Sequence, residues 1–175
     1  MNLKKYLPFE NFTLTTNLTF EEINKRLENS IEEKKKTFFS FSRLNSLKPY
    51  EGFIKNNSFV MSRIIHYRNS FLPIISGEII NINEHSTIKI TISLTKFTKF
   101  FVGFWLGIVG LVCLISLLFG LLSINNIMKH GFSPFALIPF GMFIFGFSLV
   151  YFGFKYESKI SKTFLIDLLK GQIAQ

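Results

Sequence analysis

Side chains that could do acid–base or metal chemistry are few in this sequence and lie far apart. The histidines are His66, His85 and His130, and the one cysteine is Cys113. The histidines fall in a predicted strand, a predicted turn and a loop between two apolar segments, so we do not expect them to form one site. A metal centre needs several such ligands at a fixed spacing. The sequence therefore predicts neither a metal nor a cofactor.

Ser70 and His66 are the pair at short range that combines a nucleophile with a base. Catalysis by such a pair needs a carboxylate that orients the base, and none stands nearby. The strand would also have to bend for the two side chains to meet. Gly52 and Gly77 are isolated, so they do not form a phosphate-binding loop. We therefore predict no catalytic residues and a protein that is not an enzyme.

The charge is strongly basic, with 20 Lys and Arg against 11 Asp and Glu. Nucleic-acid-binding modules place exposed aromatic residues among basic ones on a single surface. Here the aromatic residues outside the apolar segments alternate as core positions do. We therefore expect the positive charge to face anionic lipid and predict no nucleic-acid partner.

The sequence contains two long segments without charged residues, residues 100–124 and 132–154. At about 1.5 Å per helical residue, each can cross a hydrocarbon layer of roughly 30 Å. A hairpin of two helices satisfies its own backbone where water is absent. We predict a transmembrane hairpin over residues 100–154. The absence of charged residues within either apolar segment argues against an ion or proton pathway through a single hairpin.

Small residues in the first segment allow helices to approach closely. They are Gly103, Gly107 and Gly110, and the first two form a G-x-x-x-G pattern. This pattern serves either the partner helix of the same hairpin or a second copy of the chain. The first interpretation is the default, and the second predicts a homo-oligomer.

Lysines predict the orientation of the hairpin. Those flanking the two segments on the outer sides are Lys89, Lys96, Lys99, Lys155, Lys159 and Lys162. The connecting loop has Lys129 alone. Because Lys and Arg near membrane ends favour the cytoplasmic side, we predict that both termini are cytoplasmic. The N-terminus also lacks the apolar run of a signal peptide.

The part outside the membrane begins with a predicted strand over residues 11–16 and a predicted helix over residues 20–34. Thr19 and Glu22 form a capping box at the start of that helix. Period-two patterns follow, with Phe39 and Phe41 on one side of their segment. The later predicted strands cover residues 50–55, 58–67, 72–82 and 87–97. An amphipathic piece over residues 159–170 predicts a last helix.

This order predicts an α+β fold. We expect an antiparallel sheet with one N-terminal and one C-terminal helix, and a two-helix transmembrane hairpin inserted before the last helix. Residues 1–99 and 155–175 would form one cytoplasmic domain, and residues 100–154 the hairpin.

A distinctive segment, Tyr67-Arg68-Asn69-Ser70-Phe71-Leu72-Pro73, stands before Gly77 and the predicted membrane hairpin. The chain resembles uncharacterised small bacterial two-span membrane proteins that carry a Tyr-Arg-Asn-Ser-Phe-x-Pro segment. The resemblance covers residues 50–170 and implies a bacterial inner membrane without implying a reaction. The element order is also similar to helix-grip domains, in which a C-terminal helix closes a curved sheet over an apolar ligand.

The segment around Arg68 is the candidate functional surface. Antiparallel pairing of residues 72–82 with residues 87–97 places the preceding turn at the end of the sheet that leads into the hairpin. The residues expected at membrane headgroups or at a partner surface are Tyr67, Arg68, Asn69, Phe71, Lys96 and Lys99. Alternatively, Asn69 and Ser70 make a plain turn, and Arg68 pairs with an acid such as Glu157.

The sequence thus favours a membrane-anchored interaction or accessory module of the bacterial inner membrane. Its expected partners are the lipid bilayer and either another membrane protein or a second copy of the chain. A different hypothesis is that a lipid or other apolar ligand binds between the sheet and the C-terminal helix, in a cavity of a few hundred Å³. A third hypothesis is an oligomeric membrane pore built through Gly103 and Gly107.

Overall fold

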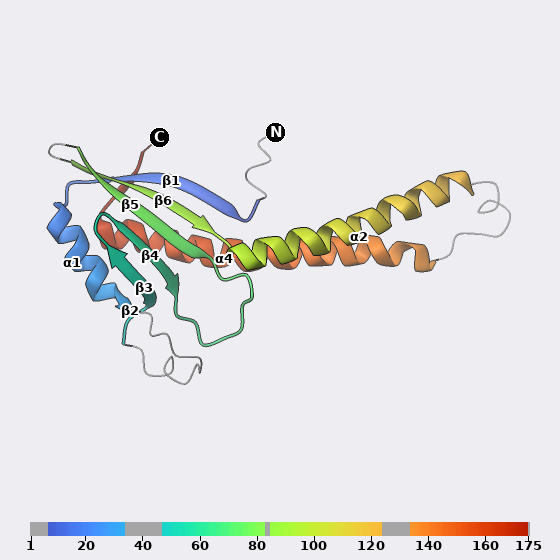
Figure 1. Ribbon diagram of the computed structural model, residues 1–175, viewed down its shortest axis with the longest axis horizontal. Helices are drawn as coiled ribbons and strands as arrows, with labels where there is room; N and C mark the ends of the chain where they lie inside the picture. The colour runs from blue at the N-terminus through green and yellow to red at the C-terminus, as the bar shows by residue number, and fades with distance from the viewer. Residues whose placement is uncertain (1–6, 34–46, 83–84, 124–133, 175) are drawn as a thin grey trace. The chain divides into compact units, whose positions relative to one another are not determined.

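A computed structural model describes residues 7–33, 47–82, 85–123 and 134–174 (Figure 1). The chain divides into two compact units. Unit 1 comprises Met1–Thr95 and Gly153–Gln175, and unit 2 comprises Lys96–Phe152.

Unit 1 is an α+β fold, as the sequence predicts. Its seven strands form one sheet in the order β2-β3-β4-β5-β6-β1-β7. The strands are β1 (Phe9–Thr16), β2 (Ile31–Glu33), β3 (Tyr50–Lys55), β4 (Ser58–Arg63), β5 (Ile74–Ile82), β6 (His85–Ser93) and β7 (Gln172–Ile173). Strand β1 pairs with β6 on one side and with β7 on the other, and the β1–β7 pairing joins the two chain segments of unit 1.

The sheet is mixed, which corrects the prediction of a purely antiparallel sheet. Strand β2 runs parallel to β3, with Ile31 opposite Tyr50. Helix α1 (Phe20–Ser30) passes directly into β2 at Ile31, and residues 34–49 separate β2 from β3. Neighbouring strands joined by such a long crossover connection can run parallel, whereas a short hairpin turn makes them antiparallel. The predicted strand residues Phe39 and Phe41 lie outside the described residues.

Helix α1 begins at the predicted capping box. Thr19 Oγ1 accepts from the Glu22 amide, and the Glu22 carboxylate accepts from the Thr19 amide at 2.9 Å. Ile23 and Leu27 on its inner face are fully buried. The helix ends at Ser30, earlier than the predicted residue 34, because Ile31 is extended and its side chain is buried.

The β3–β4 hairpin turns at Asn56 and Asn57, as predicted, and Asn56 has a φ of 49°. Asn tolerates this left-handed backbone better than most residues. Strand β6 buries one face of alternating residues, also as predicted, and these are Ile88, Ile90 and Ile92. It ends at Ser93 rather than at residue 97, because the chain turns into helix α2 at Lys96.

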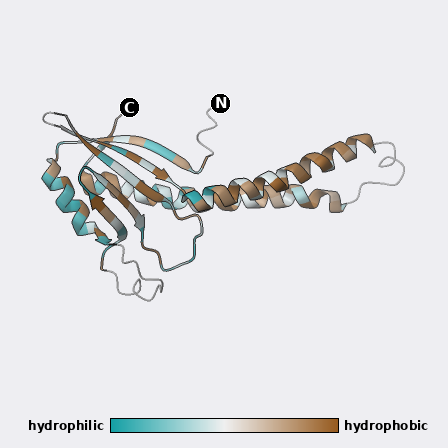
Figure 2. Cartoon of the chain, in the orientation of Figure 1, coloured by the Kyte–Doolittle hydropathy of each residue, from teal (hydrophilic) through white to brown (hydrophobic). Residues whose placement is uncertain are grey.

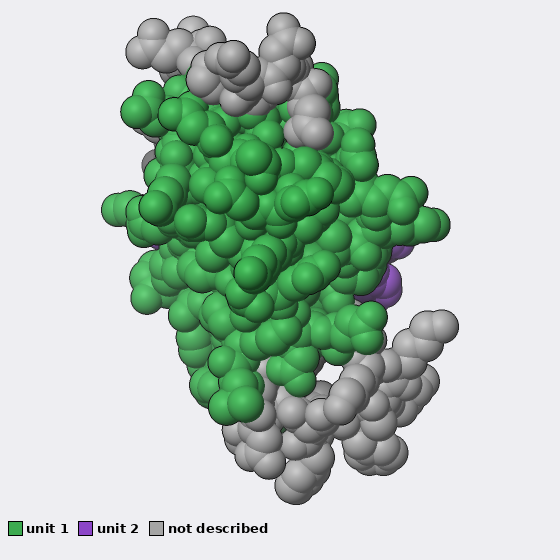
Figure 3. Space-filling view, turned by 90° about the vertical axis from the view of Figure 1, so that its left-hand side faces the viewer, with its two compact units in different colours: residues 1–95, 153–175 green, residues 96–152 purple. Residues whose placement is uncertain are grey.

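The last helix is longer than the predicted piece at residues 159–170. Helix α4 runs without a break over Ile138–Leu169, so residues 138–152 belong to unit 2 and residues 153–169 to unit 1. Its buried side chains in unit 1 are Phe154, Glu157, Ser158, Ser161, Leu165 and Leu169. This stripe faces the sheet, since Tyr50 and Phe164 have ring centroids 4.5 Å apart and Thr16 Oγ1 donates to the Leu169 carbonyl at 2.6 Å. In the end view of Figure 3, unit 1 forms one continuous body.

Unit 2 holds helix α2 (Lys96–Leu122), the short helix η3 (Pro134–Leu137) and the first half of α4. Two helical stretches, Lys96–Leu122 and Pro134–Leu169, are long and apolar enough to cross a membrane, with mean hydropathies of 2.6 and 2.0 in their most apolar windows. Only 11% of each window is buried, and Figure 2 shows the apolar colouring along both helices. The predicted connecting loop at residues 125–131 lies outside the described residues.

Glycines in unit 2 differ in what they contact. Gly146 lies against the Trp105 ring, where a Cβ would come within 2.1 Å, and Gly110 lies near Phe143. At Gly103 and Gly107 a Cβ would meet nothing within 4 Å. The close helix approach therefore occurs at Gly146, which the sequence analysis did not single out, rather than at the G-x-x-x-G pair.

Candidate functional site

The side chain of Glu157 is fully buried between α4 and the sheet. Arg63 Nη1 donates to Glu157 Oε2 at 2.8 Å, and the Tyr67 hydroxyl donates to Glu157 Oε1. A buried carboxylate is costly unless it is paired and hydrogen-bonded. Both carboxylate oxygens therefore have a partner, one of them charged.

Strand geometry explains why Arg63 reaches Glu157. Successive residues of a strand point to opposite faces, and the inward positions of β4 are Phe59, Met61 and Arg63. Phe59 and Met61 are buried, and Arg63 comes last, where β4 ends. Its guanidinium therefore points toward α4, with its side chain 28% exposed.

The loop between β4 and β5 rests on α4. Asn69 Nδ2 donates to the Gly153 carbonyl at 3.1 Å, and the Phe71 amide donates to Asn69 Oδ1 at 2.9 Å. A Cβ at Gly153 would lie 3.0 Å from the Phe71 ring, so the absence of a side chain at Gly153 lets the loop come this close. Tyr67, Asn69 and Phe71 thus have defined structural contacts, all within unit 1.

Electrostatics follow from this arrangement. Burial raises the pKa of the Tyr67 hydroxyl, and its hydrogen bond to Glu157 raises that pKa further. Burial lowers the pKa of Arg63, but the hydrogen bond and the negative charge of Glu157 outweigh this effect, so the pKa of Arg63 is raised. The guanidinium thus stays charged and Tyr67 stays a hydrogen-bond donor at neutral pH.

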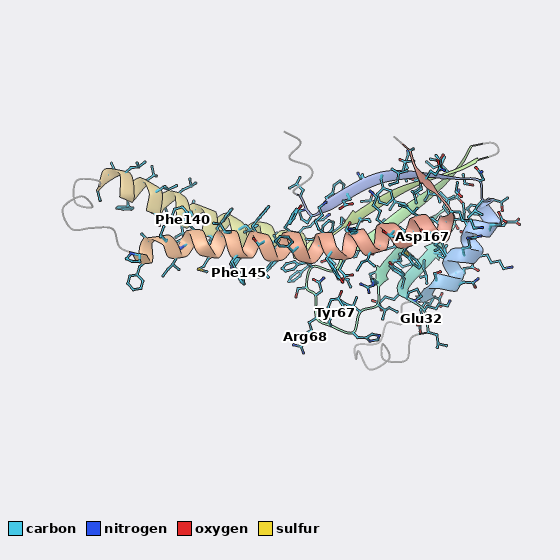
Figure 4. All side chains as sticks on the ribbon, turned by 180° about the vertical axis from the view of Figure 1, so that it is seen from behind. Glu32, Tyr67, Arg68, Phe140, Phe145 and Asp167 are labelled. Atoms are coloured by element: carbon cyan, nitrogen blue, oxygen red, sulfur yellow. The ribbon has the colours of Figure 1, made fainter. Side chains whose placement is uncertain are left out.

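Arg68 behaves differently from its neighbours. It is exposed, and Figure 4 shows its side chain directed away from the fold. Among the described residues it forms no ion pair, so the alternative in which Arg68 pairs with Glu157 is wrong. The partner of Glu157 is Arg63, which lies on the same face of β4 as the buried residues Phe59 and Met61. This alternation can be read from the sequence, but the sequence analysis did not use it. Lys96 and Lys99 are exposed on the first turn of α2, in unit 2.

Two further contacts fix the same part of α4 on strand β1. Lys155 Nζ donates to Glu10 Oε1 at 2.7 Å, and both side chains are partly exposed. Lys162 Nζ lies 4.7 Å from the centre of the Phe12 ring. Lys155 therefore has its charge compensated within unit 1.

A groove of about 700 Å³ lies on the outer face of the sheet. It is open to solvent, and its lining includes Lys55, Glu78 and Lys89 from β3, β5 and β6. Across the sheet from it, the interface with α4 contains the Tyr50–Phe164 ring contact and a hydrogen bond from Tyr50 to Ser161 at 3.4 Å.

The two residues considered for catalysis lie at the surface. His66 and Ser70 are both exposed in the β4–β5 loop. Across residues 7–33, 47–82, 85–123 and 134–174, no three His, Cys, Asp or Glu side chains gather as metal ligands would. His130 lies outside the described residues.

Comparison of the chain with protein-family models, with curated proteins and with solved structures finds no match.

Proposed function

We propose that this chain is a membrane-anchored, non-enzymatic interaction or accessory module of a bacterial inner membrane. The observation that carries the proposal is the exposure of the apolar helices. Large apolar side chains on α2 are open to solvent, among them Phe100 at 73%, Phe119 at 67% and Leu122 at 85%. An apolar surface of this extent needs a partner, and hydrocarbon is the partner that fits two helices of this length.

The core of a soluble protein is a poor alternative for these helices, since their apolar windows are only 11% buried. The lysines at the outer ends of the two segments support an orientation with both termini in the cytoplasm. The inner membrane of a bacterium is the location that the resemblance through residues 67–73 implies.

The non-enzymatic part of the proposal rests on how the polar groups of unit 1 are used. The buried carboxylate of Glu157 is held by Arg63 and Tyr67, and Asn69 is held by Gly153 and Phe71. These groups fasten the β4–β5 loop to α4. They support a structural task, in which unit 1 presents a fixed surface at the membrane.

Binding of an apolar ligand between the sheet and α4 is a weaker hypothesis. Tyr50 and Phe164 are in ring contact in that space, and Leu14 and Leu165 are fully buried there. A ligand would have to displace these contacts.

The test of the anchoring is extraction and topology in bacterial cells. The chain should stay with the membrane pellet after washing at alkaline pH. A reporter that is active only in the cytoplasm should be active when fused after Gln175 and inactive when fused at Met128. The reverse reporter pattern would refute the orientation, and release of the chain by the alkaline wash would refute the anchoring.

The test of the accessory role is native co-purification of the full chain, with mass spectrometry of proteins and lipids together. A stoichiometric membrane-protein partner would support the proposal. A stoichiometric apolar small molecule that survives purification would instead favour the ligand-binding hypothesis.

A further inference from the structure

We propose that the end of unit 1 formed by the β4–β5 loop is a docking surface for anionic phospholipid headgroups, with Arg68 as the residue that binds a lipid phosphate. This inference rests on the proposed function, because it needs the apolar helices to lie in a bilayer. It adds which surface of unit 1 touches the membrane and which lipid class that surface selects.

The β4–β5 loop contacts α4 close to the end of its apolar segment. Asn69 and Phe71 contact Gly153, and Tyr67 contacts Glu157, four residues further along the same helix. Gly153 still lies in the uncharged segment that ends at residue 154. About 6 Å of helix separates Gly153 from Glu157. If that apolar segment fills the hydrocarbon layer, the loop on Gly153 lies at headgroup depth.

Strand register places further groups at the same end of the sheet. Ser93, the last residue of β6 before the chain leaves unit 1, pairs with both Ile74 and Phe9. Exposed aromatic side chains occur here on three different elements: Phe9 at 42%, Tyr67 at 49% and Tyr156 at 65%. Tyr in particular is enriched where protein meets headgroups, because its ring is apolar and its hydroxyl is polar.

Charge at this end identifies the lipid class. Arg63 is paired with Glu157 and Lys155 with Glu10, so those cations are compensated. Arg68 is exposed and has no ion-pair partner among the described residues. A guanidinium can hold a phosphate through two parallel hydrogen bonds, and a basic side chain near an anionic leaflet gains further attraction. The expected occupant is therefore an anionic phospholipid such as phosphatidylglycerol.

The experiment uses the full chain in vesicles of phosphatidylcholine, with and without phosphatidylglycerol. Trp105, the only tryptophan, reports whether α2 is in the bilayer, through quenching by lipids with brominated acyl chains. With Cys113 changed to Ser, a nitroxide is attached at Ser70→Cys or, as the matched control, at Asn17→Cys. Asn17 is exposed and follows β1 at the opposite end of the sheet. Lipids with nickel chelated at the headgroup should relax the nitroxide at residue 70 and leave that at residue 17 unchanged.

The role of Arg68 is tested by the lipid that the chain retains from mixed vesicles. Arg68→Ala should lower the preference for phosphatidylglycerol about fivefold, which corresponds to ~1 kcal/mol for one basic residue near the surface. Arg68→Lys should fall between wild type and Arg68→Ala, because it keeps the charge and loses the paired hydrogen bonds. Lys55→Ala removes an exposed positive charge at the far end of β3 and should leave the preference unchanged.

The outcomes separate the two proposals. If Trp105 is quenched and the nitroxide at residue 70 behaves like that at residue 17, the docking surface is wrong and the anchoring stands. If Lys55→Ala lowers the lipid preference as much as Arg68→Ala, the effect is net charge and the role of Arg68 is wrong. If Trp105 is not quenched, the anchoring fails and the docking surface fails with it.

Discussion

Arg63→Ala tests whether the buried ion pair fastens α4 to the sheet. Glu157 is fully buried, and Arg63 supplies its charged partner at 2.8 Å. Removing one partner of a buried pair costs ~3–5 kcal/mol, because the remaining charge is left without compensation. Here the side chain of Arg63 is 28% exposed and Tyr67 still donates to the carboxylate, so the expected loss is lower, about 2–3 kcal/mol.

Hydrogen exchange of the full chain in detergent micelles measures this loss locally, because exchange through local opening reports the free energy of that opening. Amides of β4 and of residues 157–169 should exchange roughly 30 to 150 times faster in Arg63→Ala than in wild type, since each 1.4 kcal/mol is about tenfold. Glu157→Gln should have a smaller effect, about 1–2 kcal/mol, because water can reach the partly exposed Arg63 once its partner is neutral.

Lys155→Ala is the matched control for this experiment. Like Arg63→Ala, it removes a positive side chain that forms an ion pair between α4 and the sheet. In this pair, however, the side chains of Lys155 and Glu10 are both more than a fifth exposed. Such pairs contribute about 0–1 kcal/mol. If Arg63→Ala accelerates exchange no more than Lys155→Ala does, the buried pair does not stabilise the fold and our reasoning about Glu157 is refuted.

Four further variants test other parts of unit 1. Leu169→Asp puts a charge at a fully buried position and should lower the free energy of unfolding by on the order of 4 kcal/mol. Leu168→Asp, at a half-buried position, should lower it clearly less. Equal melting temperatures of the two variants would contradict the assigned buried face of α4. Gly77→Ala should cost about 1–3 kcal/mol in a thermal melt, because a Cβ there would come within 2.2 Å of the Phe59 ring, and an unchanged melt would mean that the ring moves freely. The pKa of Tyr67 is raised in the folded state, so its protonated hydroxyl contributes stability. This contribution is complete below the unfolded tyrosine pKa of about 10 and is lost as the pH rises through the folded pKa. Tyr67→Phe should therefore lose less melting temperature above about pH 10 than wild type, and identical alkaline profiles would refute the assignment.

Local rules predicted much of the fold. The capping box at Thr19 and Glu22 gave the start of α1, and alternation at Ile88, Ile90 and Ile92 gave the buried face of β6. Both features depend on residues close in sequence. For that reason they can be read from the sequence without knowing what packs against them.

Two features of the fold could not be read in this way. The parallel strand β2 has only three residues, and its partner β3 lies well downstream, so no local pattern marks the pairing. The unbroken course of α4 was hidden by composition, because the change from apolar to charged residues after residue 154 resembles an element boundary. Nothing in the backbone ends there, since no Pro or Gly follows until Gly171.

The sequence predicted the position of the 67–71 loop at one end of the sheet, but only part of its contacts. The loop at residues 67–71 was expected at the end of β5 that leads toward the apolar segments, and Ile74 pairs with Ser93 there. One alternative predicted Arg68 as the ion-pair partner of Glu157, but that partner is Arg63. The choice between Arg63 and Arg68 depends on which side of β4 faces α4, and that follows from tertiary packing.

Strand β1 and the last part of α4 have a consequence for how the chain matures on the ribosome. Thr16 meets Leu169 across 153 positions of sequence, and Leu14 pairs with Ile173. All of Lys96–Phe152 must be translated between the sheet and the helix that covers it. At about 5–20 residues per second this takes roughly 3 to 11 seconds. During that interval the nascent sheet, with Ile88 and its buried neighbours, is without its cover and is a target for chaperones.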